Sequence, residues 1–199
     1  MTEARSDPGR ERPYHHGDLR RALLDAAVTT IAEEGLAAIS LRRLARRVGV
    51  SHAAPAHHFG DKAGLLTAIA ADGYRRLAET LRDVYDQTGS VLEVGVAYVR
   101  FALENRPYFE VMFRPELYRA DDAELSAARR AAAAMLYGPV GRLGEGDVDV
   151  DALHAGVAAW SLAHGLATLW INGALPPQLG DDPERVARAV ASYLFRPRA

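Results

Sequence analysis

The chain has 199 residues, of which 49% are hydrophobic, and it carries a formal net charge of −2. This length suits one large domain or two smaller ones with a sizeable apolar core. The chain has no cysteine, which excludes disulfides, thiolate zinc sites and thiol nucleophiles and fits a reducing compartment. No apolar run is long enough to span a membrane, and the polar N-terminus is not typical of a secretory signal. We therefore expect a cytoplasmic protein with no membrane contact.

Positive charge is concentrated near the start of the chain. Residues 36–62 contain one acidic residue, Asp61, and five cations, which are Arg42, Arg43, Arg46, Arg47 and Lys62. Five of the seven histidines also precede residue 60, whereas the chain after Lys62 has 14 basic and 18 acidic residues. A basic head on an acidic body is typical of a DNA-binding segment joined to a separate domain. The alternative is that the arginines form a solvated helix face.

The first elements are short helices separated by glycine. Residues 1–13 are polar and are expected to form a disordered tail. Asp18 is expected to cap a helix over about 19–34, whose apolar residues recur every four positions, and Gly35 to end it.

A pair of short helices is expected next. Ser40 is expected to cap a helix over 41–48 that Gly49 ends, and Ser51 to cap another that ends near Phe59. The two helices and the tight glycine turn between them resemble a helix-turn-helix unit.

The rest of the chain also follows a helical pattern. Asp61 is expected to cap a long fourth helix over about 61–86, which would connect the head to the body. Further helices are expected over 91–105, 107–114, 121–142, 150–173 and 182–195. No segment alternates convincingly between apolar and polar residues, so we predict an all-α fold.

The unit between Ser40 and Phe59 has the features of a DNA reader. One helix must lie in the major groove while a second packs across it. Helix starts capped by Ser40 and Ser51 would direct backbone amides at phosphates. The small residues after Ser51 allow the backbone to approach base edges closely.

Five segments between residues 15 and 70 resemble the N-terminal domain of the tetracycline-repressor (TetR) family. They are Leu23–Ala27, Glu33–Leu36, Ser40–Ala45, Val48–Ser51 and His57–Leu66. The resemblance implies an all-helical homodimer, with an N-terminal three-helix DNA-binding domain and a helical C-terminal domain for ligand binding and dimerisation. It also implies repression that ends when an effector binds.

The resemblance assigns roles to individual residues. Positions that usually contact phosphates are matched by Ser40, Ser51, His57 and Lys62, and positions that usually meet bases are matched by His52 and Ala53. With the two nearby arginines and Ala56, the predicted DNA-binding residues are Ser40, Arg42, Arg43, Ser51, His52, Ala53, Ala56, His57 and Lys62.

Two positions depart from the family pattern. Ala56 stands where the family often has tyrosine, so one usual phosphate contact is missing. Pro55 stands where a helix former is usual, and proline inside a helix removes a hydrogen bond. We therefore expect the third helix to begin as a looser turn that becomes regular only at Pro55.

The C-terminal half carries a second motif. Trp160, the pair His164-Gly165 and Leu169 resemble a subset of the same family. Trp160 and His164 are four residues apart and share a helix face. They could sense a ligand, or Trp160 could belong to the core while His164 donates to a backbone carbonyl.

Aromatic and sulfur-containing side chains suggest a pocket for a small apolar or amphipathic effector. The candidate lining residues are Tyr98, Phe101, Phe109, Met112, Phe113, Met135, Trp160 and His164. The same stripe at helical spacing could equally be plain core. Small residues such as Ala155 and Ala159 in the eighth helix would allow another helix to approach, and the resemblance implies a dimer interface on the last two helices. The alternative for these residues is packing within the chain.

No enzyme signature is present. His52, His57 and His58 lack the spacing of helical metal ligands, and no serine-hydrolase, phosphate-loop or dinucleotide motif occurs, so we expect no catalysis, metal or cofactor. We predict a DNA-binding domain over residues 14–62 and an effector-binding and dimerisation domain over residues 87–199. The protein is expected to be a sequence-specific regulator that leaves a near-palindromic operator when an effector binds. The alternative is a helical adaptor or a degenerate family member that does not bind DNA.

Overall fold

The computed structural model describes residues 16–138 and 150–193, and within these two stretches all regular structure is helical, as predicted. The head consists of α1 (His16–Glu34), α2 (Leu41–Val48) and α3 (Ala54–Phe59). The body consists of α4 (Lys62–Thr88), α5 (Val91–Glu104), α6 (Arg106–Met112), α7 (Ala123–Tyr137), α8 (Val150–Ile171) and α9 (Pro183–Ala191). Short 3₁₀ turns lie at Leu36–Ala38, Pro115–Leu117 and Pro177–Leu179. The predicted tail, residues 1–13, lies outside the described residues.

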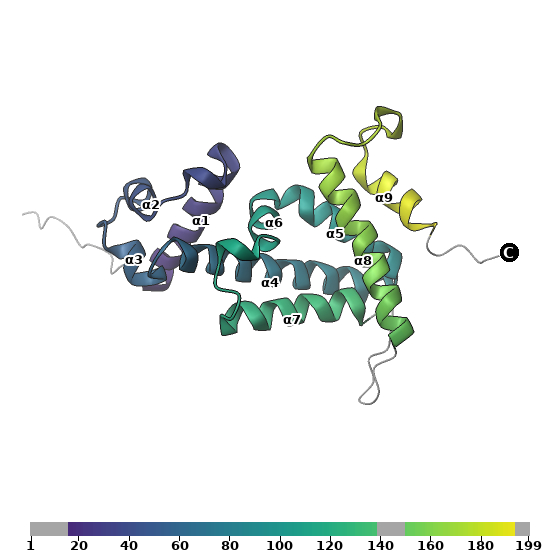
Figure 1. The fold of residues 1–199 in the computed structure, drawn as a ribbon, viewed down its shortest axis with the longest axis horizontal. Helices are drawn as coiled ribbons and strands as arrows, with labels where there is room; N and C mark the ends of the chain where they lie inside the picture. The colour runs from purple at the N-terminus through teal and green to yellow at the C-terminus, as the bar shows by residue number, and fades with distance from the viewer. Residues whose placement is uncertain (1–15, 139–149, 194–199) are drawn as a thin grey trace, which may run out of the picture.

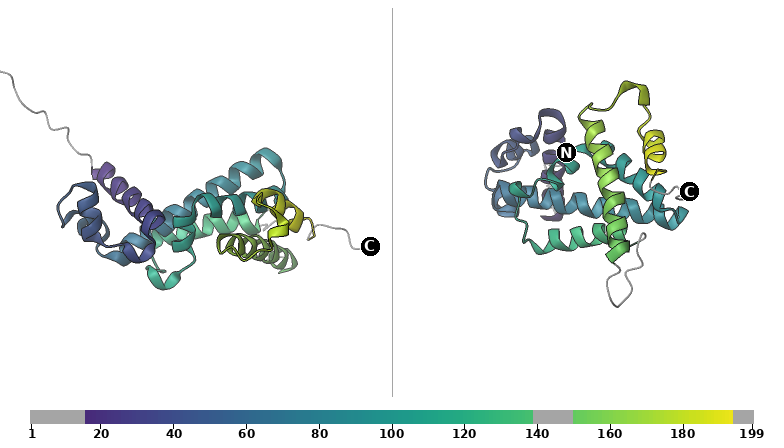
Figure 2. Two further views of the ribbon diagram at one scale, coloured as in Figure 1. Left: turned by 90° about the horizontal axis from the view of Figure 1, so that it is seen from above. Right: turned by 45° about the vertical axis from the view of Figure 1, so that its right-hand side comes forward.

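The head and the C-terminal helices lie at opposite ends of the molecule (Figure 1). The start of α4 lies beside α3, and the helix then runs lengthwise beneath α6 with α7 alongside it (Figure 1). The far end of the body is covered by α8 and α9, which pack on α5 (Figure 2). No helix among the described residues is long and apolar enough to cross a membrane.

Capping explains most of the observed helix ends. The side chain of Ser40 accepts a hydrogen bond from the backbone N–H of Arg43 at 3.3 Å, and Gly49 ends α2 with a φ of 76°. Asp61 caps α4 by accepting from the N–H of Gly64 at 2.8 Å. The prediction for Asp18 is wrong, because α1 begins two residues earlier, at His16.

The third helix begins later than its predicted cap. Ser51 does not cap α3; its backbone carbonyl instead accepts from the N–H of Ala54 at 3.1 Å. Residues 52–53 form a turn, and the helix begins at Ala54. Pro55 therefore lies in the first helical turn, where a missing N–H leaves no hydrogen bond unmade. The expected delayed start is confirmed.

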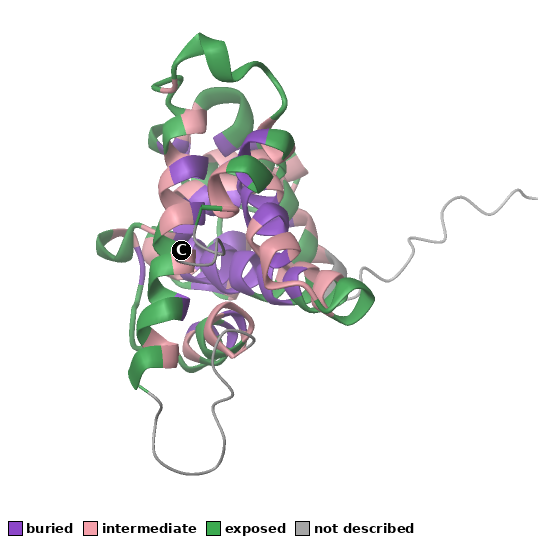
Figure 3. Ribbon diagram, turned by 90° about the vertical axis from the view of Figure 1, so that its right-hand side faces the viewer, coloured by how far each residue is buried: buried purple, intermediate pink, exposed green. Residues whose placement is uncertain are grey.

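One cluster of buried apolar residues extends from the head into the body, and the buried residues gather in the interior while exposed residues lie at the periphery (Figure 3). In the head, Leu23, Leu44 and Phe59 are buried together with Leu65 from the first turns of α4. In the body, α6 approaches α4 closely at Gly73, where an added Cβ would lie 2.6 Å from the sulfur of Met112. Met112 itself is fully buried, so its side chain has no space into which it could move.

We expect Gly73→Ala to lower the free energy of unfolding by about 1–3 kcal/mol, because it overpacks this contact. Gly95→Ala is the matched control. Gly95 is also inside a helix, but nothing lies within 4 Å of an added Cβ, so alanine should be neutral or stabilise by up to about 1 kcal/mol. Urea titrations of the wild type and both variants, at the same protein concentration, measure the difference in unfolding free energy. Equal effects of the two substitutions would contradict the packing of Gly73 against Met112.

Candidate nucleic-acid interface and effector cavity

The surface around α3 exposes most of the predicted DNA-binding residues. Ser51, His52, Ala53, Ala56 and His57 are all exposed. They lie on α3 and on the turn before it, while Ser40 and Lys62 are exposed at the starts of α2 and α4. The structure thus brings small side chains, two imidazoles and a lysine to one end of the molecule. This arrangement leaves the backbone of α3 accessible to a large partner.

The arginines of α2 fall into two groups. Arg43 forms an ion pair with Glu34 of α1, and Arg47 forms one with Glu33 at 2.8 Å. In contrast, Arg42 and Arg46 are exposed and make no ion pair with any residue that the structure describes.

This division changes the expectation for one predicted residue. The guanidinium of Arg43, which was predicted to contact DNA, is engaged with α1 and holds the two head helices together. The i,i+4 spacing of Arg43 and Arg47 opposite the adjacent pair Glu33-Glu34 is the sequence signal for this role. Sequence reasoning did not use that signal.

An ion pair connects the head to the body. One carboxylate oxygen of Asp61 caps α4, and the other accepts a hydrogen bond from the guanidinium of Arg119 at 2.9 Å. The backbone N–H of Arg119 also donates to the hydroxyl of Thr67 at 3.0 Å. The hydrogen bond from Gly64 and the charge of Arg119 lower the pKa of Asp61. The segment before α7 is thereby attached to the start of α4, directly after α3.

A buried carboxylate joins α4 to α6. Asp72 is only 4% exposed. It accepts hydrogen bonds from Arg76 at 2.9 Å and from the hydroxyl of Tyr108 at 3.0 Å, and Arg75 lies 3.2 Å away. These partners outweigh the cost of burial and keep the pKa of Asp72 below its usual value. A buried charge is tolerated here because every neighbour that faces it is a cation or a donor.

His164 lies at the centre of an aromatic cluster. Its Nδ1 is 2.9 Å from the hydroxyl of Tyr98, so its partner is a side chain and not the backbone carbonyl considered above. The rings of Phe113 and Phe109 lie 4.5 Å and 5.3 Å from the imidazole, and that of Trp160 lies 5.9 Å away. Burial lowers the pKa of His164, which favours the neutral ring.

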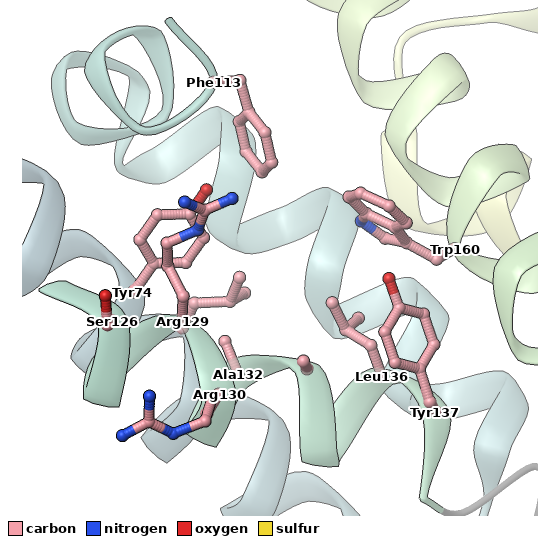
Figure 4. A pocket seen from close by; sticks show the side chains of 11 residues that line it. Tyr74, Phe113, Ser126, Arg129, Arg130, Ala132, Leu136, Tyr137 and Trp160 are labelled. Carbon is pink, nitrogen blue, oxygen red and sulfur yellow. The ribbon is translucent and has the colours of Figure 1, made fainter. Parts of the chain in front are cut away.

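A cavity of about 480 Å³ lies beside this cluster, between α4, α7 and α8 (Figure 4). Its described lining is Tyr74, Leu77, Phe113, Ser126, Arg129, Arg130, Ala132, Ala133, Leu136, Tyr137 and Trp160. A second cavity, of about 320 Å³, is lined in part by the same Phe113 and also by Arg106, Phe109, Glu110, Arg114, His164, Thr168, Ile171 and Asn172. The volume of the larger cavity falls in the range of small-molecule sites.

The predicted pocket residues divide between cavity wall and core. Phe113 lines both cavities, Trp160 the larger one, and Phe109 and His164 the smaller one. Three others are buried in the core and line neither cavity, namely Tyr98, Phe101 and Met112. Met135 is half-buried and also lies outside both linings.

Sequence reasoning placed Met135 of α7 in the pocket but missed most of the residues through which that helix lines the larger cavity. Ser126, Arg129, Ala133 and Tyr137 recur every three or four residues, which places them on one helix face. Their mixed polarity is typical of a solvated surface, so the pattern did not distinguish a cavity wall from an exposed face.

Comparisons with known proteins agree over the whole chain. The family model described as tetracyclin repressor-like, C-terminal domain, matches residues 91–194, and the one described as bacterial regulatory proteins, tetR family, matches residues 23–69. A solved structure from Rhodococcus sp. RHA1, described as a protein with unknown function, is 33% identical to this chain. It has a TM-score of 0.77 and covers 93% of this chain and 97% of its own. NalD of Pseudomonas aeruginosa, the secondary repressor of the MexAB-OprM efflux pump, has a TM-score of 0.60 at 23% identity over 91% of this chain and 96% of its own, and so shares the fold.

Curated relatives point to the same family. The HTH-type transcriptional regulator BetI of Vibrio campbellii is 28% identical over a match 184 residues long, and this match covers 86% of this chain and 88% of BetI. The HTH-type transcriptional repressor AcnR of Corynebacterium efficiens is 39% identical over 64 residues, so the match spans only about a third of each protein, 32% of this chain and 34% of AcnR. The two family models match residues 23–69 and 91–194, the second alone covering more than half of the chain, and the chain is a member of the TetR family of bacterial regulatory proteins.

Proposed function

We propose that the protein is a homodimeric, sequence-specific DNA-binding regulator that represses transcription until a small molecule occupies the cavity beside α7. The exposed surface of α3 carries this proposal, because the side chains that precede and begin the helix are small and cations flank them. Small residues allow close approach to base edges, while the flanking cations bind the backbone. Family membership supports the same conclusion.

Within this proposal each exposed residue has a role. Ser40, Ser51, His57 and Lys62 bind phosphates, whereas His52 and Ala53 meet bases. Arg42 and Arg46 are exposed without an ion-pair partner among the described residues, so they are better placed than Arg43 to add phosphate contacts. A single α3 is too short to contact many base pairs, and two heads related by a twofold axis would read a near-palindromic operator.

The surface of α8 supports dimerisation. Val157 and Leu169 are among the exposed large apolar residues of the described structure, at 40% and 45% exposed. Gly165 lies between them along the helix, and no described residue lies within 4 Å of a Cβ added there. Glycine weakens a helix by about 1 kcal/mol relative to alanine. A partner helix that packs closely at Gly165 would offset this cost, whereas packing within the chain does not require it.

The contacts of the body with the head offer a route for regulation. The cavity is lined by Tyr74 and Leu77 of α4 and by much of α7. The segment before α7 is attached through Arg119 to Asp61, at the start of α4. A ligand that moves α7 relative to α4 would therefore act on the junction next to α3, and it would release DNA to the extent that it binds one head spacing better than the other.

The interface with DNA is tested by Lys62→Ala. The substitution removes one predicted phosphate contact from each subunit. Each lost contact should make the slope of log K against log salt less steep by about 0.9, and binding to specific and to random DNA should weaken alike. Gel shifts at several salt concentrations, with the DNA that flanks the protein's own gene, measure both effects. Arg82→Ala is the matched control, since it removes the same charge from an exposed site on the body end of α4. An unchanged slope for Lys62→Ala, or equal slopes for the two variants, would contradict the assignment. A wild-type protein that binds no DNA would point to the adaptor function instead.

The dimer is tested by Leu169→Asp. Sedimentation should show a dimer of the 21.6 kDa chain for the wild type and a folded monomer for the variant, because a carboxylate buried at an interface lacks a partner. Ala127→Asp introduces the same charge at an exposed position of α7 and should remain dimeric. A wild-type monomer at micromolar concentration would overturn the architecture.

A further inference from the structure

The described lining of the larger cavity contains cations and hydrogen-bond donors but no carboxylate. Its charged residues are Arg129 and Arg130, and its other polar groups are hydroxyls and one indole N–H. In contrast, the smaller cavity combines Arg106 and Arg114 with the carboxylate of Glu110. The electrostatic character of the larger cavity is therefore positive, so it favours a ligand that brings negative charge or strong acceptors.

Arg129 is the cation best placed to meet such a ligand. Its guanidinium carbon lies 6.0 Å from the centre of the Tyr74 ring, and in Figure 4 the group points from α7 towards Phe113. It makes no ion pair with any residue in the described part of the chain. The hydroxyl of Tyr74 donates to the carbonyl of Met112 at 2.9 Å, and the contact of Arg129 with this residue is with the face of the ring.

Arg130 differs from its neighbour in direction. In Figure 4 its guanidinium points away from Phe113 and from the interior of the cavity. The two arginines are adjacent on α7, carry the same charge and are both exposed. They therefore form a natural pair for separating a specific contact from a general effect of charge.

A second donor lies on the opposite wall. The Nε1 atom of Trp160 is buried and donates to no group in the described residues. Burial raises the pKa of Tyr98 and the indole N–H opposes that shift, but the two groups do not reach hydrogen-bond geometry. An unpaired buried N–H costs about 1–3 kcal/mol. Because this nitrogen is buried, Trp160 meets the cavity through its ring, towards which the hydroxyl of Tyr137 is directed (Figure 4).

The surface between these donors is apolar. Phe113 forms one wall, while Leu77, Leu136 and two alanines form much of the rest. The rings of Phe113 and Trp160 are 6.4 Å apart and tilted by 39°, and aromatic ligands pack favourably against such rings. The cavity thus provides an apolar, partly aromatic surface with a cation on one side.

We propose that the larger cavity binds an amphipathic organic anion, a carboxylate attached to an aromatic or similarly rigid apolar body. The carboxylate pairs with Arg129, and the body packs against Phe113 and Trp160. The role of this anion as the effector rests on the proposed function, whereas its binding does not.

Isothermal titration calorimetry of the full-length protein without DNA tests the preference for an anion. The probes are 2-naphthoate and 2-naphthamide, which share the same ring system and differ in charge. We expect the naphthoate to bind at least about tenfold more tightly, equivalent to about 1.4 kcal/mol. Equal affinity, tighter binding of the amide or no binding of the naphthoate at millimolar concentration would each overturn the proposal.

Variants then assign the preference to single groups. Arg129→Gln should raise the Kd of the naphthoate to that of the amide, and Arg130→Gln should leave the preference intact. Trp160→Phe keeps an aromatic ring but offers a smaller apolar surface, so it should weaken both probes by similar factors and preserve the preference that depends on Arg129. A preference that survives Arg129→Gln, or one that is lost equally in Arg130→Gln, would overturn the assignment. Circular dichroism confirms that each variant is folded.

The outcome is separable from that of the proposed function. If the protein bound no DNA, the calorimetric preference would still decide whether the cavity is an anion site. If the naphthoate bound through Arg129 but left operator binding unchanged, the anion site would stand and the regulatory role of the cavity would fail.

Discussion

The rest of the structure depends on the burial of α4 between Leu65 and Leu81. Thirteen of its 27 residues are buried, because the helix belongs to two cores at once. Its first turns complete the core of the head, and its later turns pack against α5, α6 and α7. Each large apolar side chain that is removed from water contributes about 1.5–3 kcal/mol. Neither the head nor the other helices of the body could therefore separate from α4 without exposing a large part of their own core.

This double burial restricts what α4 can contain at its centre. Asp72 is charged and buried, and it is accommodated only because two arginines and a tyrosine surround it. One residue later, Gly73 allows α6 to approach the helix backbone. The polar cluster gives α6 a defined orientation on α4, and the glycine gives it a defined distance. Phe113, which follows α6 directly, is held in place at the wall of both cavities by these two contacts.

Local chemistry in the sequence was sufficient to predict most of the fold. Ser40, Asp61 and Gly49 act within one turn of their own positions, so a cap or a left-handed glycine can be recognised without knowledge of the tertiary structure. The prediction that Ser51 caps α3 was wrong for an equally local reason, since Pro55 is accommodated by a helix that begins after Ser51, at Ala54. The prediction that Asp18 caps α1 was wrong because the helical backbone begins at His16, before the first residue of the apolar pattern.

The cavity was less predictable, because its wall and the core have the same sequence pattern. Met112 and Phe113 are neighbours, yet the first is fully buried and the second lines two cavities. Which of them faces a cavity depends on the angle at which α8 crosses the body, and helix crossing is a tertiary property. Arg129 was missed because it lies on a helix face of mixed polarity, where an arginine is most often solvated.

The length of α4 sets a mechanical scale for the protein. At 1.5 Å per residue, its 27 residues span about 40 Å. The head is attached at one end of this rod, and the cavity contacts its middle through Tyr74 and Leu77. Successive base pairs of DNA are about 3.4 Å apart, so a rotation of the helix by about 5° about its far end would displace the end at the head by about one base-pair step. Under the proposed function α4 would act as a rigid lever, and a rearrangement too small to disturb the fold would be large on the scale of the DNA helix.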